Sequence, residues 1–319
     1  MLKARRCRCR IRLSCGAVLT LYDELYKAQF PHILTGHEQG AVHAADGYAR
    51  VTGRTGVCFA TSGPGVCNMV TGIATANMDS IPLVIISGQV ATPLIGRDSF
   101  QEADISGITT PITKHNYLVK DVKELPRVLK EAFYIASTGR PGPVLVDIAK
   151  DVFDTSFEFE YPKDVYLRGY SGNQEGCQDD VVRAVKSLAK AKRPVLLTGG
   201  GVILSEMAET LRTIVQQLGI PVVTTLMGKG SIPDDWDCHL GMVGMHALTP
   251  PIWPLPSVIC SLPSVSALMT ALPATLRILR RRQPSSTSIS IRLKSIRSSM
   301  PISVSTPIFA GLCRGSAKY

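Results

Sequence analysis

The uninterrupted apolar run over residues 82–87 (PLVIIS) places the strongest constraint on the fold of this chain. A strand with apolar side chains at consecutive positions must be covered on both faces, as the central strands of parallel sheets are. Strand and helix patterns alternate on both sides of this run, from Ala17 to Ile148. The alternation predicts an α/β domain in which helices cover both faces of a parallel sheet.

The expected elements follow from the spacing of apolar residues and from turn residues. We expect helices over residues 18–27, 38–52, 65–76 and 122–137, and strands over 32–35, 56–61, 82–87, 112–119 and 143–148. In a second block we expect helices over 178–190 and 205–218, and strands over 194–199 and 221–226. The predicted organisation is a first domain over 17–150, a linker over 151–176 and a partial Rossmann-like central domain over 177–247.

The two ends of the chain differ in composition from its middle. Residues 1–16 hold six basic residues and no acid, and residues 248–319 hold nine basic residues, nine prolines and no acid. We expect an aberrant basic N-terminus in the place of a strand, and an aberrant, poorly ordered tail. A change of reading frame on either side of an authentic central segment would explain both ends.

Composition also excludes several classes of function. The net charge of +10 is carried by the two ends, and no nucleic-acid-binding motif accompanies it, so no nucleic-acid partner is expected. No helical apolar run suited to spanning a bilayer is present, so no membrane partner is expected. The nine cysteines form no Cys-x-x-Cys pair, and no metal site is expected from these residues.

Two short segments lie where open α/β sheets bind ligands, beyond the carboxyl ends of strands. Glu38 begins a predicted helix directly after the apolar pair Ile33-Leu34. One strand–helix unit later, the turn over residues 61–65 (TSGPG) opens another predicted helix, which contains Asn68. Taken alone, Glu38 is most often a first-turn glutamate favoured by the helix dipole, and glycine-proline turns are common.

Taken together, these segments resemble the pyrimidine-binding domain of thiamine diphosphate (ThDP) enzymes, and most of all the catalytic subunits of acetolactate synthases (acetohydroxyacid synthases). The resemblance covers about residues 17–247. It implies that Glu38 is the catalytic activator of the cofactor. Its carboxyl group would hydrogen-bond N1′ of the aminopyrimidine and favour the 4′-imino tautomer, which removes the proton from C2 of the thiazolium ring. It also implies that the pyrimidine is lined by Thr61, Ser62, Gly63 and Asn68.

Further strings match the same family. Gln89 and the run over residues 99–102 (SFQE) match a segment near the active centre, which implies that Gln101 is catalytic and that Phe100 lies in the substrate region. Lys114 matches a lysine that could pair with an anionic substrate or cofactor. The plain alternatives are a surface loop with one buried aromatic and an exposed lysine.

The resemblance also implies an FAD site. Arg140 matches an arginine that contacts the flavin cofactor, and a guanidinium suits a pyrophosphate. Gly199-Gly200-Gly201 after a strand resembles a nucleotide-phosphate turn, although it lacks the full G-x-G-x-x-G pattern. The flavin-binding middle domain of the family is matched further on by Thr225, Met227, Met245 and His246.

The activity that the resemblance implies is condensation of two pyruvates, or of pyruvate with 2-oxobutyrate, with decarboxylation. This reaction supplies precursors of valine, leucine and isoleucine. The expected partners are 2-keto acids and other subunits, in a homodimer or a tetramer with a regulatory small subunit. The expected compartment is the cytoplasm in a bacterium, and the plastid or mitochondrion in a eukaryote.

Mg²⁺ and the cofactor's diphosphate are held in this family by a Gly-Asp-Gly motif and a downstream asparagine. No Gly-Asp-Gly occurs in the 319 residues, so we expect weak ThDP binding and no turnover from this chain alone. The alternatives are another ThDP–flavin enzyme, such as glyoxylate carboligase or pyruvate oxidase, and a non-catalytic truncated subunit. A simple dinucleotide-binding module, resting on Gly199–Gly201, is the third alternative.

Overall fold

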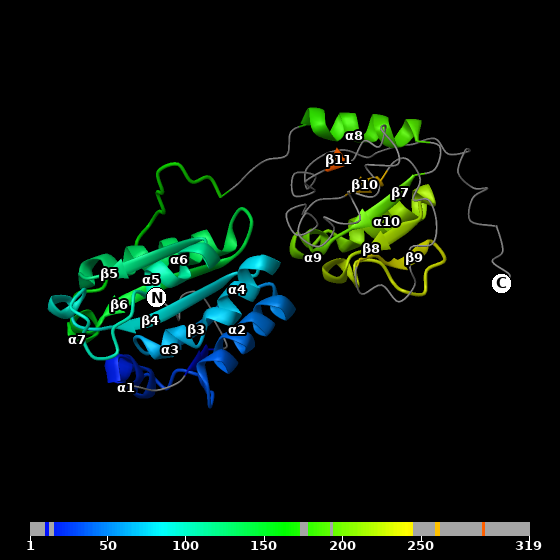
Figure 1. The fold of residues 1–319 in the computed structure, drawn as a ribbon. Coiled ribbons are helices and arrows are strands. Elements are labelled where there is room, and N and C mark those ends of the chain that lie inside the picture. The colour runs from blue at the N-terminus through cyan, green and yellow to red at the C-terminus, as the bar shows by residue number, and fades with distance from the viewer. Residues whose placement is uncertain are drawn as a thin grey trace. The chain divides into compact units, whose positions relative to one another are not determined.

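The structure of the chain is a computed structural model that describes residues 10–12, 16–172, 178–191, 194–244, 259–261 and 289–290. These residues belong to two compact units, one within residues 1–174 and one within 175–319 (Figure 1). Each unit is built on its own parallel sheet. Within the described ranges, no helix is long and apolar enough to cross a membrane.

The first unit contains a six-stranded sheet in the order β2-β1-β3-β4-β6-β5, and all neighbouring strands are parallel. The strands are β1 (Arg10–Arg12), β2 (Ile33–Leu34), β3 (Gly56–Ala60), β4 (Leu83–Gln89), β5 (His115–Val119) and β6 (Pro143–Ala149). Every residue of β4 is buried, as the apolar run predicted.

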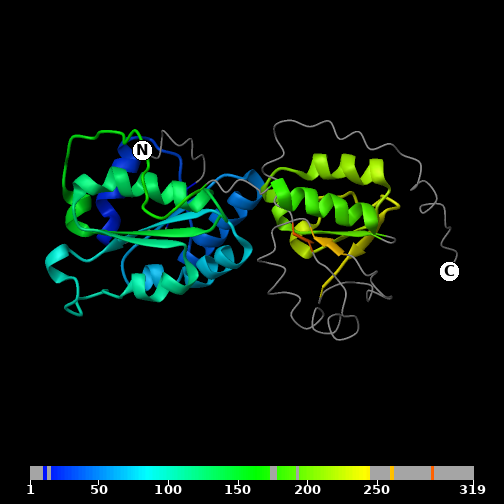
Figure 2. The same ribbon diagram turned by 90° about the horizontal axis from the view of Figure 1, so that it is seen from above.

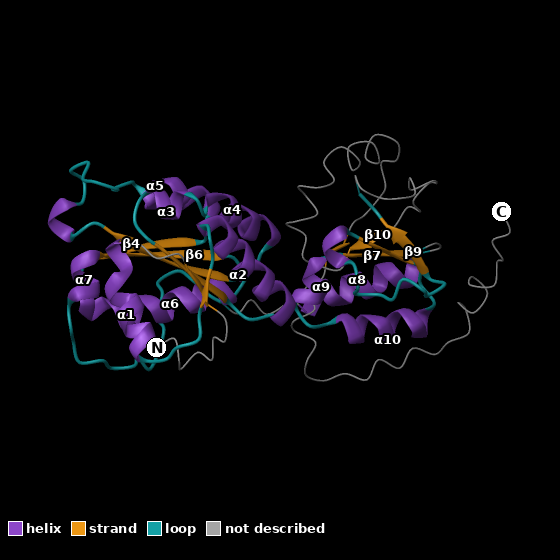
Figure 3. Ribbon diagram, turned by 90° about the horizontal axis from the view of Figure 1, so that it is seen from below, coloured by secondary structure: helices purple, strands orange, loops and turns teal. Residues whose placement is uncertain are grey.

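Helices cover both faces of this sheet (Figures 2 and 3). One core joins α2 and α4 to strand residues such as Cys58 and Ile85, and the other joins α6 to their sequence neighbours Val57 and Val84. Successive strand residues therefore point to opposite helix layers, and the predicted α/β class is confirmed. The helices are α1 (Leu19–Lys27), α2 (Glu38–Thr52), α3 (Pro64–Cys67), α4 (Val70–Asp79), α5 (Ile105–Thr109), α6 (Leu125–Ser137) and α7 (Lys150–Asp154).

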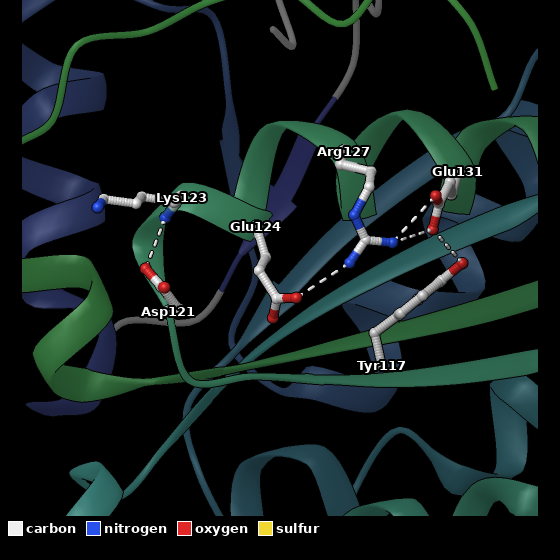
Figure 4. A network of polar contacts seen from close by, with 6 residues as sticks. All are labelled: Tyr117, Asp121, Lys123, Glu124, Arg127 and Glu131. Atoms are coloured by element: carbon white, nitrogen blue, oxygen red, sulfur yellow. Dashed lines mark hydrogen bonds and ion pairs between the residues drawn. The ribbon is translucent and has the colours of Figure 1, made fainter. Parts of the chain in front are cut away.

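A polar network fixes α6 to β5 (Figure 4). The buried carboxylate of Glu131 accepts hydrogen bonds from Tyr117 Oη at 2.9 Å and from Arg127 Nη1 at 3.0 Å. Arg127 also donates to Glu124, and Asp121 accepts the backbone N–H of Lys123 where the chain turns into the helix. These contacts lie apart from the segments that match the cofactor motif.

Two of the sequence expectations need correction in this unit. Residues 10–12 form a strand inside the basic N-terminus, because β2 and β3 offer hydrogen-bonding edges on both sides of it. The predicted helix over 65–76 is divided into α3 and α4, with Asn68 and Met69 between them.

The structure describes residues 151–172 of the predicted linker over 151–176, and these residues are attached to the first unit. The segment begins with α7, and Lys130 Nζ donates to the carbonyl oxygens of Pro162 and Lys163 at 2.6 and 2.7 Å. Farther along, the N–H of Gly139 donates to the carbonyl of Gly172 at 2.9 Å. The segment over 155–172 therefore packs on the first unit.

The second unit contains a parallel sheet in the order β11-β10-β7-β8-β9. Its strands are β7 (Val195–Thr198), β8 (Val222–Thr224), β9 (His239–Met242), β10 (Ile259–Ser261) and β11 (Ile289–Ser290). Its helices are α8 (Gln178–Lys190), α9 (Gly200–Leu204) and α10 (Ala208–Leu218). β10 and β11 fall in the predicted aberrant tail, and the rest of that tail lies outside the described residues.

Candidate functional site

The side chain of Glu38 is buried at the start of α2. His37 caps the helix: its Nδ1 accepts the backbone N–H of Gln39 at 3.1 Å, and its carbonyl accepts that of Ala41. The cap starts the helix immediately after β2 and directs the next side chain inward, so that Glu38 is only 6% exposed. The sequence predicted the helix and its start, and missed the capping function of His37.

Asn68 and Gly65 define the surroundings of the Glu38 carboxylate. Asn68 Nδ2 donates to Glu38 Oε2 at 3.1 Å. A Cβ atom at Gly65 would lie 3.5 Å from Glu38 Oε1 and 2.7 Å from Thr61 Cγ2, so a side chain there would crowd the turn. Asn68 was expected inside a helix and instead caps the end of α3, because the helix stops at Cys67.

The turn after β3 contributes two buried side chains, Thr61 and Ser62. The hydroxyl Oγ1 of Thr61 is fully buried and has no hydrogen-bond partner among the described residues. Buried hydroxyls are almost always paired, so the unpaired Thr61 Oγ1 is an unusual feature of this turn. The structure thus brings Glu38, Asn68 and this turn together, as the sequence predicted.

Gln101 reaches the same turn through its backbone. Gly63 has φ +56°, and a Cβ atom there would overlap the carbonyl oxygen of Gln101. Gln101 itself has φ +59° and is half-buried. Phe100, next to it, is 88% exposed, so the alternative of a loop with one buried aromatic is wrong.

Lys114 and Arg140 lie at the amino ends of the strands, on the opposite side of the sheet from Glu38 and the 61–65 turn. Both precede strands, β5 and β6, whereas Glu38 and the 61–65 turn follow strands. Lys114 Nζ donates to the carbonyls of Ile135 and Thr138 and to Tyr170 Oη, and burial lowers its pKa to about 8. The structure does not bring Lys114 together with Glu38, because the amino and carboxyl ends of parallel strands lie on opposite edges.

Arg140 has structural partners in the first unit. Its Nε donates to Ser80 Oγ at 2.7 Å and its Nη2 to the carbonyl of Met78 at 3.2 Å. These contacts hold the turn before β6 against the end of α4. Contact of Arg140 with FAD stays a prediction.

In the second unit, the glycine turn and the segment after β8 lie side by side. Gly199 precedes α9, and a Cβ atom at Gly200 would lie 3.0 Å from Met227 Cβ. Thr225 Oγ1 accepts the N–H of Gly228 at 3.1 Å. Gly199, Gly200, Gly201, Thr225 and Met227 therefore gather beyond the carboxyl ends of β7 and β8. Met245 and His246 lie outside the described residues.

Asp147 on β6 was not predicted from the sequence as a site residue. Its carboxylate is 1% exposed and accepts hydrogen bonds from Ser87 Oγ at 2.6 Å and Gln89 Nε2 at 3.0 Å. Burial raises its pKa to about 6. The available signal was a single acid inside the apolar strand run over 143–149 (PVLVDIA). In the part of the chain that the structure describes, no group of three or more His, Cys, Asp or Glu side chains could hold a metal ion.

Comparison with protein families gives two matches. Residues 1–108 match the model described as "Thiamine pyrophosphate enzyme, N-terminal TPP binding domain". Residues 181–252 match the model described as "Thiamine pyrophosphate enzyme, central domain". The first match includes the basic N-terminus and β1.

Curated relatives match the chain over 72% of its length. It is 57% identical over 232 residues to acetolactate synthase of Mycobacterium bovis, and 54% identical over 232 residues to the acetolactate synthase large subunit of Corynebacterium glutamicum. It is 52% identical over 234 residues to a probable acetolactate synthase large subunit of Methanocaldococcus jannaschii. The matched residues span 38%, 37% and 40% of these three relatives.

Proposed function

The chain belongs to the thiamine pyrophosphate enzymes, with the N-terminal and central domains of that family, and on this premise we propose that it is part of an acetolactate synthase large subunit. The proposed reaction condenses two pyruvates, or pyruvate and 2-oxobutyrate, with loss of CO₂. The proposed pathway is the biosynthesis of valine, leucine and isoleucine. The names of relatives that are 52–57% identical support this proposal.

The observation that carries the proposal is the buried carboxyl group of Glu38, which Asn68 holds beside Gly65 of the 61–65 turn. Asn68 occupies Oε2, and Gly65 keeps the side of Oε1 free of a side chain. Thr61 Oγ1 lacks a partner among the described residues. A buried carboxyl group with a glycine-lined approach fits the aminopyrimidine end of ThDP, which carries hydrogen-bonding nitrogens on a flat ring.

The residues of this chain would bind and orient the cofactor. ThDP, when bound, supplies the carbon nucleophile and the electron sink for decarboxylation. Glu38 would hold a proton shared with ring nitrogen N1′, in surroundings where water does not compete for the carboxyl group. Asn68 fixes the orientation of that carboxyl group through its hydrogen bond to Oε2. The wall of the site would be completed by Gly63 and the backbone of Gln101.

Two further cofactors belong to the proposal. For FAD we propose the cluster of Gly199–Gly201, Thr225 and Met227 in the second unit. The family resemblance of Arg140, Met245 and His246 to flavin contacts stays a prediction from the sequence. For Mg²⁺ and the diphosphate, the family motif Gly-Asp-Gly is absent from the sequence. We propose that this chain holds ThDP mainly through the pyrimidine and that it does not turn over pyruvate alone. Assembly as a homodimer, or with a regulatory subunit, remains part of the proposal.

Thiamine binding tests the proposal without requiring turnover. Because only the pyrimidine end is held, thiamine and ThDP should bind this chain with similar, weak affinity in calorimetric titrations. Glu38→Gln should weaken binding of both by about tenfold or more, since the amide has no acidic proton to share with N1′. The matched control is Glu24→Gln, the same change at an exposed position of α1.

Equal affinities of the wild-type chain and Glu38→Gln would contradict the assignment of Glu38. Absence of any thiamine binding by the wild-type chain would contradict the proposed site as a whole. Tighter binding of ThDP than of thiamine by a large factor would show that the chain also holds the diphosphate.

A further inference from the structure

A second buried carboxyl group, that of Asp147, lies in the C-terminal half of β6, toward the carboxyl ends of the strands, where Glu38 and the 61–65 turn also lie. Its two hydrogen-bond donors, Ser87 and Gln89, are neutral residues of the neighbouring strand β4. Holding an ionised carboxyl group in such surroundings costs folding free energy, and groups of this kind concentrate at functional sites.

Gln89 connects Asp147 to the loop over residues 90–104, which joins β4 to α5. Gln89 Oε1 accepts the N–H of Val90 at 2.8 Å, at the beginning of the loop. Gln89 Nε2, which donates to Asp147, also lies 3.4 Å from the carbonyl oxygen of Ala103, near its end. One amide side chain, oriented by Asp147, therefore contacts both ends of the loop.

Two other carboxylates hold the loop between these ends. Asp151 accepts the N–H and hydroxyl of Thr92 at 3.0 and 3.1 Å. Glu102 accepts the N–H groups of Gly96 and Ser99. Those backbone hydrogen bonds lower the pKa of Glu102, and the bonds from Thr92 lower the pKa of Asp151 against the opposing effect of burial. Both groups therefore stay ionised near neutral pH.

The loop in turn forms one side of the Glu38 site. The backbone of Gln101 lies against Gly63, so closely that only a glycine fits there. Gly65, two residues on, faces Glu38 Oε1. A contiguous series of contacts thus runs from Asp147 through Gln89 and the loop to the turn beside Glu38.

We propose that Asp147 is a positioning residue: through Gln89 it holds the 90–104 loop, and with it Gln101, against the turn that faces Glu38. The predicted effect of Asp147 on cofactor binding rests on the proposed function. The predicted effect of Asp147 on the loop is independent of the proposed function. The occupant of the site that Asp147 serves is the aminopyrimidine end of ThDP.

Asp147 should act through its charge, so its effect should depend on pH. The residues paired with it, Ser87 on β4 and Leu118 on β5, are neutral, and Asp104 at the start of α5 is the charged group that also raises its pKa. The pKa of Asp147 is about 6, so ionisation occurs between about pH 5 and pH 7.5. A hydrogen bond to the ionised form is stronger than one to the neutral acid.

Hydrogen exchange of the peptide over 90–104, followed by mass spectrometry, tests the loop directly. In the wild-type chain, protection factors should rise about fivefold from about pH 5 to pH 7.5. Asp147→Asn should abolish this rise and lower protection at the higher pH by a similar factor. The matched control, Asp121→Asn, removes a carboxylate that caps the turn before α6 and should leave the loop unchanged (Figure 4).

Gln89→Met tests whether Asp147 acts through Gln89. If it does, Asp147→Asn and Gln89→Met should each loosen the loop, and the double variant should be no looser than Gln89→Met alone. Additive effects of the two substitutions would overturn the proposed route. Protection that is flat with pH in the wild-type chain would overturn the proposal even if Asp147→Asn failed to fold.

Thiamine titration separates this inference from the proposed function. Asp147→Asn should weaken thiamine binding at about pH 7.5 by about fivefold, together with the loss of loop protection. Loss of loop protection with unchanged thiamine affinity would overturn the link between the loop and the Glu38 site. If thiamine does not bind the wild-type chain at all, the proposed function fails, while the exchange results still decide whether Asp147 positions the loop.

Discussion

At the residue scale, Asp147 should make the protein less stable at the pH where it orders the loop. Burial raises its pKa from the ordinary value of 3.8 to about 6, so the fold favours the protonated form. The stability that this preference contributes is fully present below pH 3.8 and is lost as the pH rises through about 6. The difference between the two values corresponds to about 3 kcal/mol.

We therefore expect Asp147→Asn to raise the free energy of unfolding by up to about 3 kcal/mol at about pH 8, with little effect near pH 3.8. Urea unfolding followed by far-ultraviolet circular dichroism at both pH values measures the difference. A more stable protein with a looser loop is the result that distinguishes a functional carboxylate from a structural one. Destabilisation of equal size at both pH values would contradict the assigned cause.

A second prediction at the residue scale concerns the cost in stability of replacing Gly63. An alanine there would meet two costs, the left-handed φ of +56° and overlap with the carbonyl of Gln101. Gly53 has a similar φ of +65° and open space within 4 Å of the position that a Cβ would take, so Gly53→Ala meets only the first cost, about 1 kcal/mol. Gly63→Ala should cost about 2 kcal/mol or more and expose the 90–104 loop to exchange. If Gly63→Ala and Gly53→Ala lower the free energy of unfolding in urea equally, the close approach of Gln101 to Gly63 is contradicted.

At the element scale, the parts that could be predicted are those set by local pattern. The spacing of apolar residues and alanines placed α2 at Glu38–Thr52, and the buried apolar runs located β4 and β6. Glu38 could be assigned to a site because a helix start after a strand is itself a local feature. Family resemblance then supplied its chemistry, which the pattern alone did not.

The elements that could not be predicted depend on contacts distant in sequence. β1 carries a basic sequence, and it is a strand because β2 and β3 lie on either side of it. The end of α3 places Asn68 against Glu38, thirty residues away. The 90–104 loop is shaped by Asp147 and Asp151, which follow it by more than forty residues. The partners in these contacts are too far apart in the sequence for any local pattern to include both.

At the scale of the whole molecule, the segment over 155–172 determines where the first unit ends. Polar composition predicted a linker, yet Tyr170 is fixed to the unit: its hydroxyl lies 2.9 Å from Thr138 Oγ1 and accepts a hydrogen bond from Lys114 Nζ at 3.2 Å. Lys114 was expected near the substrate and instead serves this attachment. Its half-buried ammonium group satisfies carbonyls at the end of α6 and holds the returning chain.

Removing the hydroxyl of Tyr170 tests this attachment. Tyr170→Phe keeps the ring and removes the hydrogen bonds that the hydroxyl makes with Lys114 and with Thr138, so it should lower the free energy of unfolding by about 1–2 kcal/mol. It should also speed tryptic cleavage after the exposed Arg168, because the segment would detach more often. Tyr166→Phe, at a position 86% exposed, is the matched control and should change neither. If the two variants are cleaved at the same rate, the segment is held by other contacts and the first unit ends before it.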